Sequence, residues 1–223
     1  GIKVGVISDG VQGLSSAQQS GDLPTVTVLQ SDPNGAEGTA MLEIVHDLAP
    51  AATLGFCGLP SGTTLEFISC VNSLQVSFGA DVMVDDITFP GEPYFEDGDI
   101  AQVVSMAVTE GKLYASSAGN YARNHYQGFF VNTPSAPGVH DFGLAAGVPS
   151  DPLMEISIPA GRTVTFVLQW NEPFEAAGSD YDFGIFDEFG NLLESSEEIQ
   201  DGNDNPIEAF AYTNFSSTSE KIV

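Results

Sequence analysis

Three short segments of the chain carry side chains suited to acid–base or oxyanion chemistry. Asp9 follows an apolar run at residues 4–8, and a carboxylate at the end of a buried strand lies where parallel α/β sheets build their active sites. Glu37 stands in the first turn of an expected helix, where the helix dipole favours a negative charge. Asn120 ends the run A-S-S-A-G-N at residues 115–120, and its amide can donate to an oxyanion. The first two segments, taken alone, are more typical of ordinary structure than of catalysis.

The elements that would position these residues alternate between strand and helix over residues 1–120. Short apolar runs are typical of strands covered on both faces, and amphipathic runs are typical of helices. This alternation predicts an α/β fold with a doubly wound, mostly parallel sheet, in which functional groups gather at the carboxyl ends of the strands. The expected strands are 3–8, 25–29, 53–57, 81–85 and 113–117, and the expected helices are 36–48, 63–78 and 98–110.

The character of the sequence changes after Asn120. Residues 121–151 are loop-like and rich in Asn, Pro, Gly and aromatic residues, and short alternating strands separated by turn signals follow. We therefore predict two domains, residues 1–150 as the N-terminal part of the α/β domain and residues 151–223 as a small β-sandwich module. The strands expected in the module are 154–158, 163–169, 181–187 and 208–212, and residues 221–223 look like the start of another, as in a truncated module.

The composition limits the classes of function. The chain has 31 acidic and five basic residues, which gives a net charge of −26. Such a surface repels phosphate backbones and anionic lipids, so we expect neither a nucleic-acid nor a membrane partner. We interpret the acidic residues mainly as a means of solubility, and the acidic loops would also suit a structural calcium ion. Cys57 and Cys70 would form either one disulfide in an exported protein or two reduced, buried thiols.

Together and in this order, the three segments resemble the subtilisin-like serine peptidases over about residues 2–120. The strand–Asp–Gly at Asp9 is similar to the Asp segment of that family, and E-G-T-A at Glu37 stands where the family usually has H-G-T. S-A-G-N, which ends at Asn120, is similar to its oxyanion segment. The resemblance implies an orienting acid at Asp9, a general base at Glu37 and an oxyanion donor at Asn120. It also implies a peptide or protein substrate, no cofactor required for catalysis, and a secreted or periplasmic protein.

Glu37 departs from the subtilisin pattern and resembles the sedolisins, relatives with the same fold that use Glu in place of His and work at acidic pH. A Glu base is half ionised near about pH 4, so we expect an acid optimum. Asp9 and Glu37 would then share a proton as a coupled pair. The chain also departs from the sedolisins, because Met41 stands where they have an Asp and Asn120 where they tend to have an Asp. The sequence therefore looks intermediate between the two groups.

His46 and Ser135 are rival candidates for the base and the nucleophile. His46 lies nine residues after Glu37 on the same expected helix, about 13 Å away, which excludes it from the same catalytic point. Ser135 lacks the leading Gly of the family's G-T-S-x-A-x-P motif, and the prolines and glycines near it oppose a following helix. We therefore expect the nucleophilic serine beyond Val223 and a chain that is inactive alone.

Asp85 and Asp86 end the strand that lines the substrate cleft in the subtilisin-like family. Two adjacent acids would favour basic substrate residues, bind a cation or remain solvated, and we take both as candidate substrate-binding residues.

The module at residues 151–223 resembles the bacterial pre-peptidase C-terminal domain, a β-sandwich that often acts in matrix or substrate binding. The residues that carry this resemblance are 158–161, 168–170, 179–183 and 205–208. It suggests an alternative function, a non-catalytic binding protein that keeps the peptidase scaffold and binds through the module. An apolar sheet face left bare by a missing segment would also favour a homo-oligomer or chain exchange.

Overall fold

The structure of the chain, a computed structural model, describes residues 1–32, 34–121 and 123–223 and divides into two compact units. Unit 1 comprises Gly1–Glu92 and Glu96–Asn120, and unit 2 comprises Pro93–Phe95 and Tyr121–Val223. The division after Asn120 comes earlier in the chain than the boundary that the sequence predicts after residue 150. The segment after Asn120 joins unit 2 because its aromatic residues pack there, as the ring of Phe130 does against Tyr181 at 5.3 Å.

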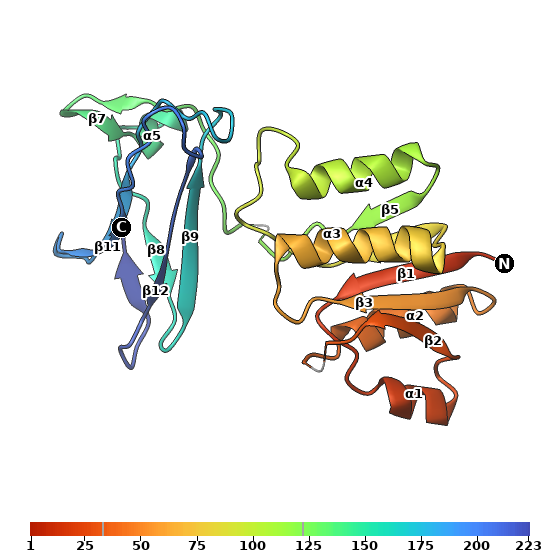
Figure 1. Cartoon of the computed structure of the whole chain (residues 1–223). Helices are drawn as coiled ribbons and strands as arrows, with labels where there is room; N and C mark the ends of the chain where they lie inside the picture. Colours follow the sequence, from red (N-terminus) through yellow and green to blue (C-terminus); the bar gives the residue numbers. More distant parts are fainter. Residues whose placement is uncertain (33, 122) are drawn as a thin grey trace. The chain divides into compact units, whose positions relative to one another are not determined.

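A five-stranded parallel sheet in the order β2-β3-β1-β4-β5 forms the centre of unit 1 (Figure 1). All four pairs of neighbouring strands run parallel, which confirms the predicted α/β class with a mostly parallel sheet. Each strand agrees with its predicted bounds to within one residue. The strands are β1 (Lys3–Ser8), β2 (Val26–Gln30), β3 (Thr53–Gly58), β4 (Val82–Asp85) and β5 (Leu113–Ser116).

Helices cover both faces of this sheet, α3 and α4 one face and α2 the other (Figure 1). The helices of unit 1 are α1 (Leu14–Ser20), α2 (Glu37–Leu48), α3 (Thr64–Asn72), the π-helix η1 (Ser73–Phe78) and α4 (Asp99–Thr109). The single helix predicted at residues 63–78 is thus divided into α3 and η1. The sequence does not predict α1, because Ala17 is the one buried residue of this helix and no apolar stripe marks it. None of the described helices is long and apolar enough to cross a membrane.

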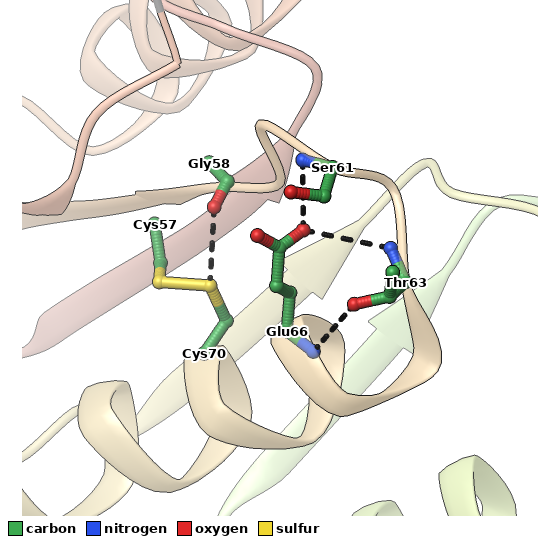
Figure 2. Close-up of a disulfide and its surroundings, with 6 residues drawn as sticks. All are labelled: Cys57, Gly58, Ser61, Thr63, Glu66 and Cys70. Atoms are coloured by element: carbon green, nitrogen blue, oxygen red, sulfur yellow. Dashed lines mark hydrogen bonds between the residues drawn. A yellow bond between two sulfur atoms is a disulfide. The ribbon is translucent and has the colours of Figure 1, made fainter.

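A disulfide between Cys57 on β3 and Cys70 on α3 decides between the two states that the sequence left open for these cysteines (Figure 2). A capping box begins the same helix: the Thr63 hydroxyl accepts from the backbone N–H of Glu66, whose carboxylate accepts from the Thr63 N–H (Figure 2). That carboxylate also accepts from the Ser61 N–H at 2.9 Å. The capping box satisfies donors that a helix start leaves free, and the disulfide joins α3 to the sheet.

Side chains of the central strands alternate between the two faces, as the period of two in a strand requires. On β1, Val4 and Val6 pack in the cluster that includes Ala17 of α1 and Leu42 of α2. Ile7, between them and the strand end, packs in the other cluster with residues of α3 and α4. Whether a residue of β1 has an even or an odd number therefore decides which helices its side chain packs against.

Unit 2 contains four two-stranded antiparallel sheets, β6 with β7, β8 with β13, β9 with β12, and β10 with β11. The predicted strand at 163–169 is present as β9, and the other predicted strands are present with shifted bounds. A last strand forms where residues 221–223 suggested one, and it pairs with β8. The elements are β6 (Asn132–Thr133), β7 (Ala136–His140), α5 (Phe142–Ala145), β8 (Ile156–Ile158), β9 (Thr163–Gln169), β10 (Phe183–Phe186), β11 (Leu192–Ser196), β12 (Ile207–Thr213) and β13 (Glu220–Ile222).

Polar networks supplement a small apolar core in unit 2. The core cluster of this unit consists of Ile158, Ile185 and Ile222, with partly buried aromatic and aliphatic side chains around it. Glu208 is 2% exposed, and its carboxylate accepts from the side chains of Ser196 and Gln200. Such a network is stable because every buried oxygen finds a donor.

Candidate functional site

The carboxyl ends of β1 and β4 lie side by side, because the two strands pair in parallel with Ile7 opposite Asp85. Asp9 directly follows β1 and Asp86 directly follows β4, so both carboxyl groups stand at the same edge of the sheet. This edge is where doubly wound sheets place their functional groups. The strand order therefore brings together two acids that are far apart in the sequence.

The start of α2 completes this edge through a hydrogen bond to Asp9. The backbone N–H of Glu37, the first residue of α2, donates to Oδ1 of Asp9 at 3.2 Å, and the Gly10 N–H donates to the same oxygen at 2.5 Å. The free N–H groups at a helix start carry partial positive charge, so they favour an acceptor of this kind. Asp9 and Glu37, the acid and base that the sequence predicts, are thus neighbours in the structure.

Gly35 permits the close approach of the loop before α2 to Asp9. A Cβ at this position would lie 1.8 Å from Oδ2 of Asp9, and the residue has a φ of +82°. The loop is tied down by the Gln12 N–H, which donates to the Gly35 carbonyl at 2.9 Å, and by the Thr39 hydroxyl, which donates to the Gln12 carbonyl at 3.0 Å. The sequence does not predict this role of Gly35, for which the one signal is a glycine shortly before the helix.

Asp85 and Asp86, which the sequence treats alike, point to opposite faces of the sheet. Asp85 is 3% exposed, on the face covered by α3 and α4, and accepts from the Ser116 hydroxyl at 3.0 Å and the Ile87 N–H at 3.2 Å. Burial raises the pKa of Asp85 above its ordinary value, although these hydrogen bonds act against the rise. Asp86 points to the same face of the sheet as Ser8, and the Ser8 hydroxyl donates to Oδ2 of Asp86 at 3.1 Å. Of the pair, Asp86 is therefore the one at the site.

The pKa of Asp86 is raised to about 6, and burial is the largest cause. The negative charges of Glu37 and Asp9 raise it further, while the hydrogen bond from Ser8 lowers it. Three acidic side chains from three elements therefore lie within electrostatic reach of one another. The basic residues of residues 1–120 are Lys3, at the start of β1, and Lys112, just before β5, so both stand at the amino edge of the sheet. A carboxyl group with perturbed pKa among like charges is typical of a functional site.

Asn120, the predicted oxyanion donor, is exposed and follows β5, the edge strand of the sheet next to β4. Its role stays a prediction. Ser116 at the end of the same strand directs its hydroxyl to Asp85, which leaves that hydroxyl engaged in a structural hydrogen bond.

The two rival residues stand elsewhere. His46 is in the last turn of α2, whereas Glu37 begins that helix. Ser135 is an exposed residue in the turn between β6 and β7 of unit 2, and a strand follows it. The prediction that no helix opens at Ser135 is confirmed. In the described part of the chain, no group of three or more His, Cys, Asp or Glu side chains has an arrangement that could hold a metal ion.

Neither the models of known protein families nor the curated proteins contain a match to this chain. Among solved structures, the chain is similar to Pseudomonas sedolisin, a serine-carboxyl proteinase in complex with two molecules of pseudo-iodotyrostatin. The TM-score is 0.39 and the sequence identity 17%, over 87% of this chain and 56% of sedolisin. The chain thus spans little more than half the length of that protein. A likeness at this level leaves the family of the chain open.

Proposed function

We propose that this chain carries the acid–base part of a serine peptidase site that cleaves peptides or proteins at acidic pH. The observation that carries the proposal is the hydrogen bond from the Glu37 N–H to the Asp9 carboxylate at the carboxyl edge of the parallel sheet. Glu37 would be the general base, Asp9 its partner and Asn120 the oxyanion donor. The nucleophilic serine would come from a segment outside these 223 residues.

In this reaction the serine hydroxyl attacks the carbonyl carbon of the scissile amide. The new Oγ–C bond forms as the Oγ proton passes to the Glu37 carboxylate, and the carbonyl oxygen takes up the negative charge. Glu37 then returns the proton to the amide nitrogen as the C–N bond breaks, which releases the amine and leaves an acyl-enzyme for water to hydrolyse. An ionised Glu37 is required at the first step and a protonated one at the second, which suits a carboxyl group at acidic pH.

Asp9 would support this cycle by fixing the start of α2. Because its Oδ1 accepts from the Glu37 N–H, the carboxylate holds the backbone from which the base projects. A base that is held in place contributes more to the rate than one that must be ordered during the reaction.

The decisive experiment compares Glu37→Gln with Glu43→Gln in the full-length gene product, assayed on a protein substrate from about pH 3 to 7. Both changes remove one carboxylate from α2 and keep the side-chain shape, but Glu43 lies about 1.7 turns further along the helix. We expect Glu37→Gln to lower kcat/KM by about 10²- to 10⁴-fold, the usual worth of a general base. Glu43→Gln should stay close to the unmodified protein.

Equal activity of the two variants would refute Glu37 as the base. Absence of turnover in the unmodified full-length protein, together with measurable peptide binding, would instead support the non-catalytic binding protein. Turnover by residues 1–223 alone that Ser135→Ala abolishes would overturn the need for an external serine.

A further inference from the structure

Asp86 has one oxygen that is bonded and one that is not. Its Oδ2 accepts from the hydroxyl of Ser8, a fully buried residue, whereas its Oδ1 is buried and has no hydrogen-bond partner among the described residues. An ionised carboxylate with one buried oxygen that lacks a hydrogen bond is costly, because only its other oxygen has a donor. The neutral form avoids that cost.

The groups that face Asp86 oppose its ionisation as well. The acids in electrostatic reach are Asp9, beyond the end of β1, and Glu37, at the start of α2, and both raise its pKa. Two other titratable side chains nearby lie on the opposite face of the sheet. They are Asp85, which precedes Asp86 on the chain, and Tyr114 of β5, which pairs with Met83 of β4. No basic side chain of unit 1 stands at this edge, as both of its lysines lie at the amino edge. Among the described residues of unit 1, the three acids therefore meet without a lysine or arginine beside them.

We propose that Asp86 is a positioning residue of the site, which stays neutral while Glu37 is ionised and whose ionisation sets the alkaline limit of activity. The effect of Asp86 on activity rests on the proposed function, whereas the protonation of Asp86 depends on the fold alone. With Asp86 neutral, no further negative charge is added beside Glu37 and Asp9. With Asp86 ionised, a third negative charge opposes the charge that develops on the substrate oxygen in the transition state.

The proton itself can be observed without any substrate. In the 223-residue chain labelled with ¹³C at Asp and Glu, the carboxyl resonance of Asp86 is assigned by its loss in Asp86→Asn and followed by NMR from pH 3 to 8. We expect a midpoint near pH 6, well above that of an ordinary Asp. A midpoint within the ordinary range of Asp would overturn the proposal.

Two variants test the cause in opposite directions. Glu37→Gln removes a negative neighbour and should lower the Asp86 midpoint, whereas Ser8→Ala removes the hydrogen bond to the ionised form and should raise it. Glu43→Gln, the same change further along α2, should leave it unmoved. If Glu37→Gln leaves the midpoint in place, the two carboxyl groups are not coupled and Asp86 does not act on the base.

The effect of Asp86 on activity is measured by the pH profile of kcat/KM in the full-length protein. Asp86→Asn keeps a neutral group that can accept from Ser8, so the alkaline limb should move to higher pH relative to the activity that the variant retains at low pH. A limb that stays in place, or a uniform loss at every pH, would overturn the role of Asp86. A full-length protein without peptidase activity but with the coupled titration would instead refute the proposed function and leave the proton on Asp86 established.

Discussion

The Asp86 carboxyl group at the sheet edge of unit 1 has few donors in the described part of the chain, whereas several carboxyl groups in unit 2 are each surrounded by N–H and O–H groups. One oxygen of Asp86 accepts from a hydroxyl, and the other is buried and has no hydrogen-bond partner among residues 1–32, 34–121 and 123–223. Asp141 in unit 2 accepts from the N–H groups of Leu144 and Asp151 and from the Ser150 hydroxyl. Burial would raise the pKa of Asp141, but these hydrogen bonds outweigh it and hold the pKa at about 2. For Asp86, burial and like charges together raise the pKa to about 6.

Two further acids of unit 2 follow the pattern of Asp141. The hydroxyl and N–H of Ser179 and the N–H of Gly178 lower the pKa of Glu172. The side chain and N–H of Asn191 lower the pKa of Asp187, which closes the turn between β10 and β11. In these places a carboxylate takes part in folding a loop.

The difference agrees with how each unit is stabilised. Unit 1 has two apolar clusters, one on each face of its sheet, and a disulfide, so it can carry a group whose ionisation is unfavourable. Unit 2 has a core of three isoleucines and depends on satisfied polar networks. Local rules are broken most often where function requires it, and the edge near Asp86 is one of the places where unit 1 leaves a buried polar atom without a hydrogen bond.

The largest effect should come from Gly35, which holds the loop against Asp9. Gly35→Ala adds a Cβ 1.8 Å from Oδ2 of Asp9 at a φ of +82°, whereas Gly62→Ala has a φ of +62° and meets nothing within 4 Å. A positive φ alone costs about 1–2 kcal/mol. Overpacking adds about 1–3 kcal/mol, so we expect a loss of about 2–5 kcal/mol for Gly35→Ala in urea unfolding followed by circular dichroism. Equal losses for the two variants would show that the loop does not press on Asp9.

A smaller effect should follow loss of the disulfide. The bond closes a loop with a sequence separation of 13, which the chain-entropy treatment values at about 3 kcal/mol. Cys57→Ser with Cys70→Ser should therefore destabilise unit 1, whose helices dominate circular dichroism at 222 nm. Trp170, the single tryptophan, reports on unit 2 by fluorescence, and its transition should stay in place. Equal shifts of both signals would mean that the two units unfold together. The disulfide would then not stabilise unit 1 separately from unit 2.

The smallest effects separate Asp86 from Asp141 by the sign of their pH dependence. The folded-state pKa of Asp86 is raised, so its contribution to stability is present below about pH 4 and lost as pH rises through about 6. Asp86→Asn should therefore raise the Tm above pH 6 and leave it unchanged below pH 4. A lower Tm at pH 7 would contradict the cost that we assign to its ionisation.

For Asp141 the sign is reversed, because its folded-state pKa is lowered. Its contribution is present above about pH 4 and is lost as pH falls through about 2. Asp141→Asn should lower the Tm at neutral pH, and the difference from the unmodified protein should shrink on acidification. Parallel pH profiles for the two Asn variants would remove the distinction between the two kinds of carboxyl group.

Much of unit 1 could be predicted because its elements are local. The apolar run at residues 3–8 predicts β1 with its observed bounds, and the amphipathic run that ends before Pro50 predicts α2. Elements without such a pattern were missed. The sequence of β11 is Leu-Leu-Glu-Ser-Ser, which shows no clear alternation, and β6 and β7 lie in a stretch rich in proline and glycine.

The sequence by itself determined the strands and main helices of the parallel sheet and the acids at their ends, because apolar periodicity and capping act over a few residues. It placed Asp9 after a strand and Glu37 at a helix start, and it named Asp86 without separating it from Asp85. The tertiary structure decided that separation, together with the partner Ser8. Both depend on β4 pairing with β1, and no local pattern specifies which strands pair across some eighty residues of chain. The proton that we assign to Asp86 arises from that pairing, since burial and like charges exist only once the edge is assembled.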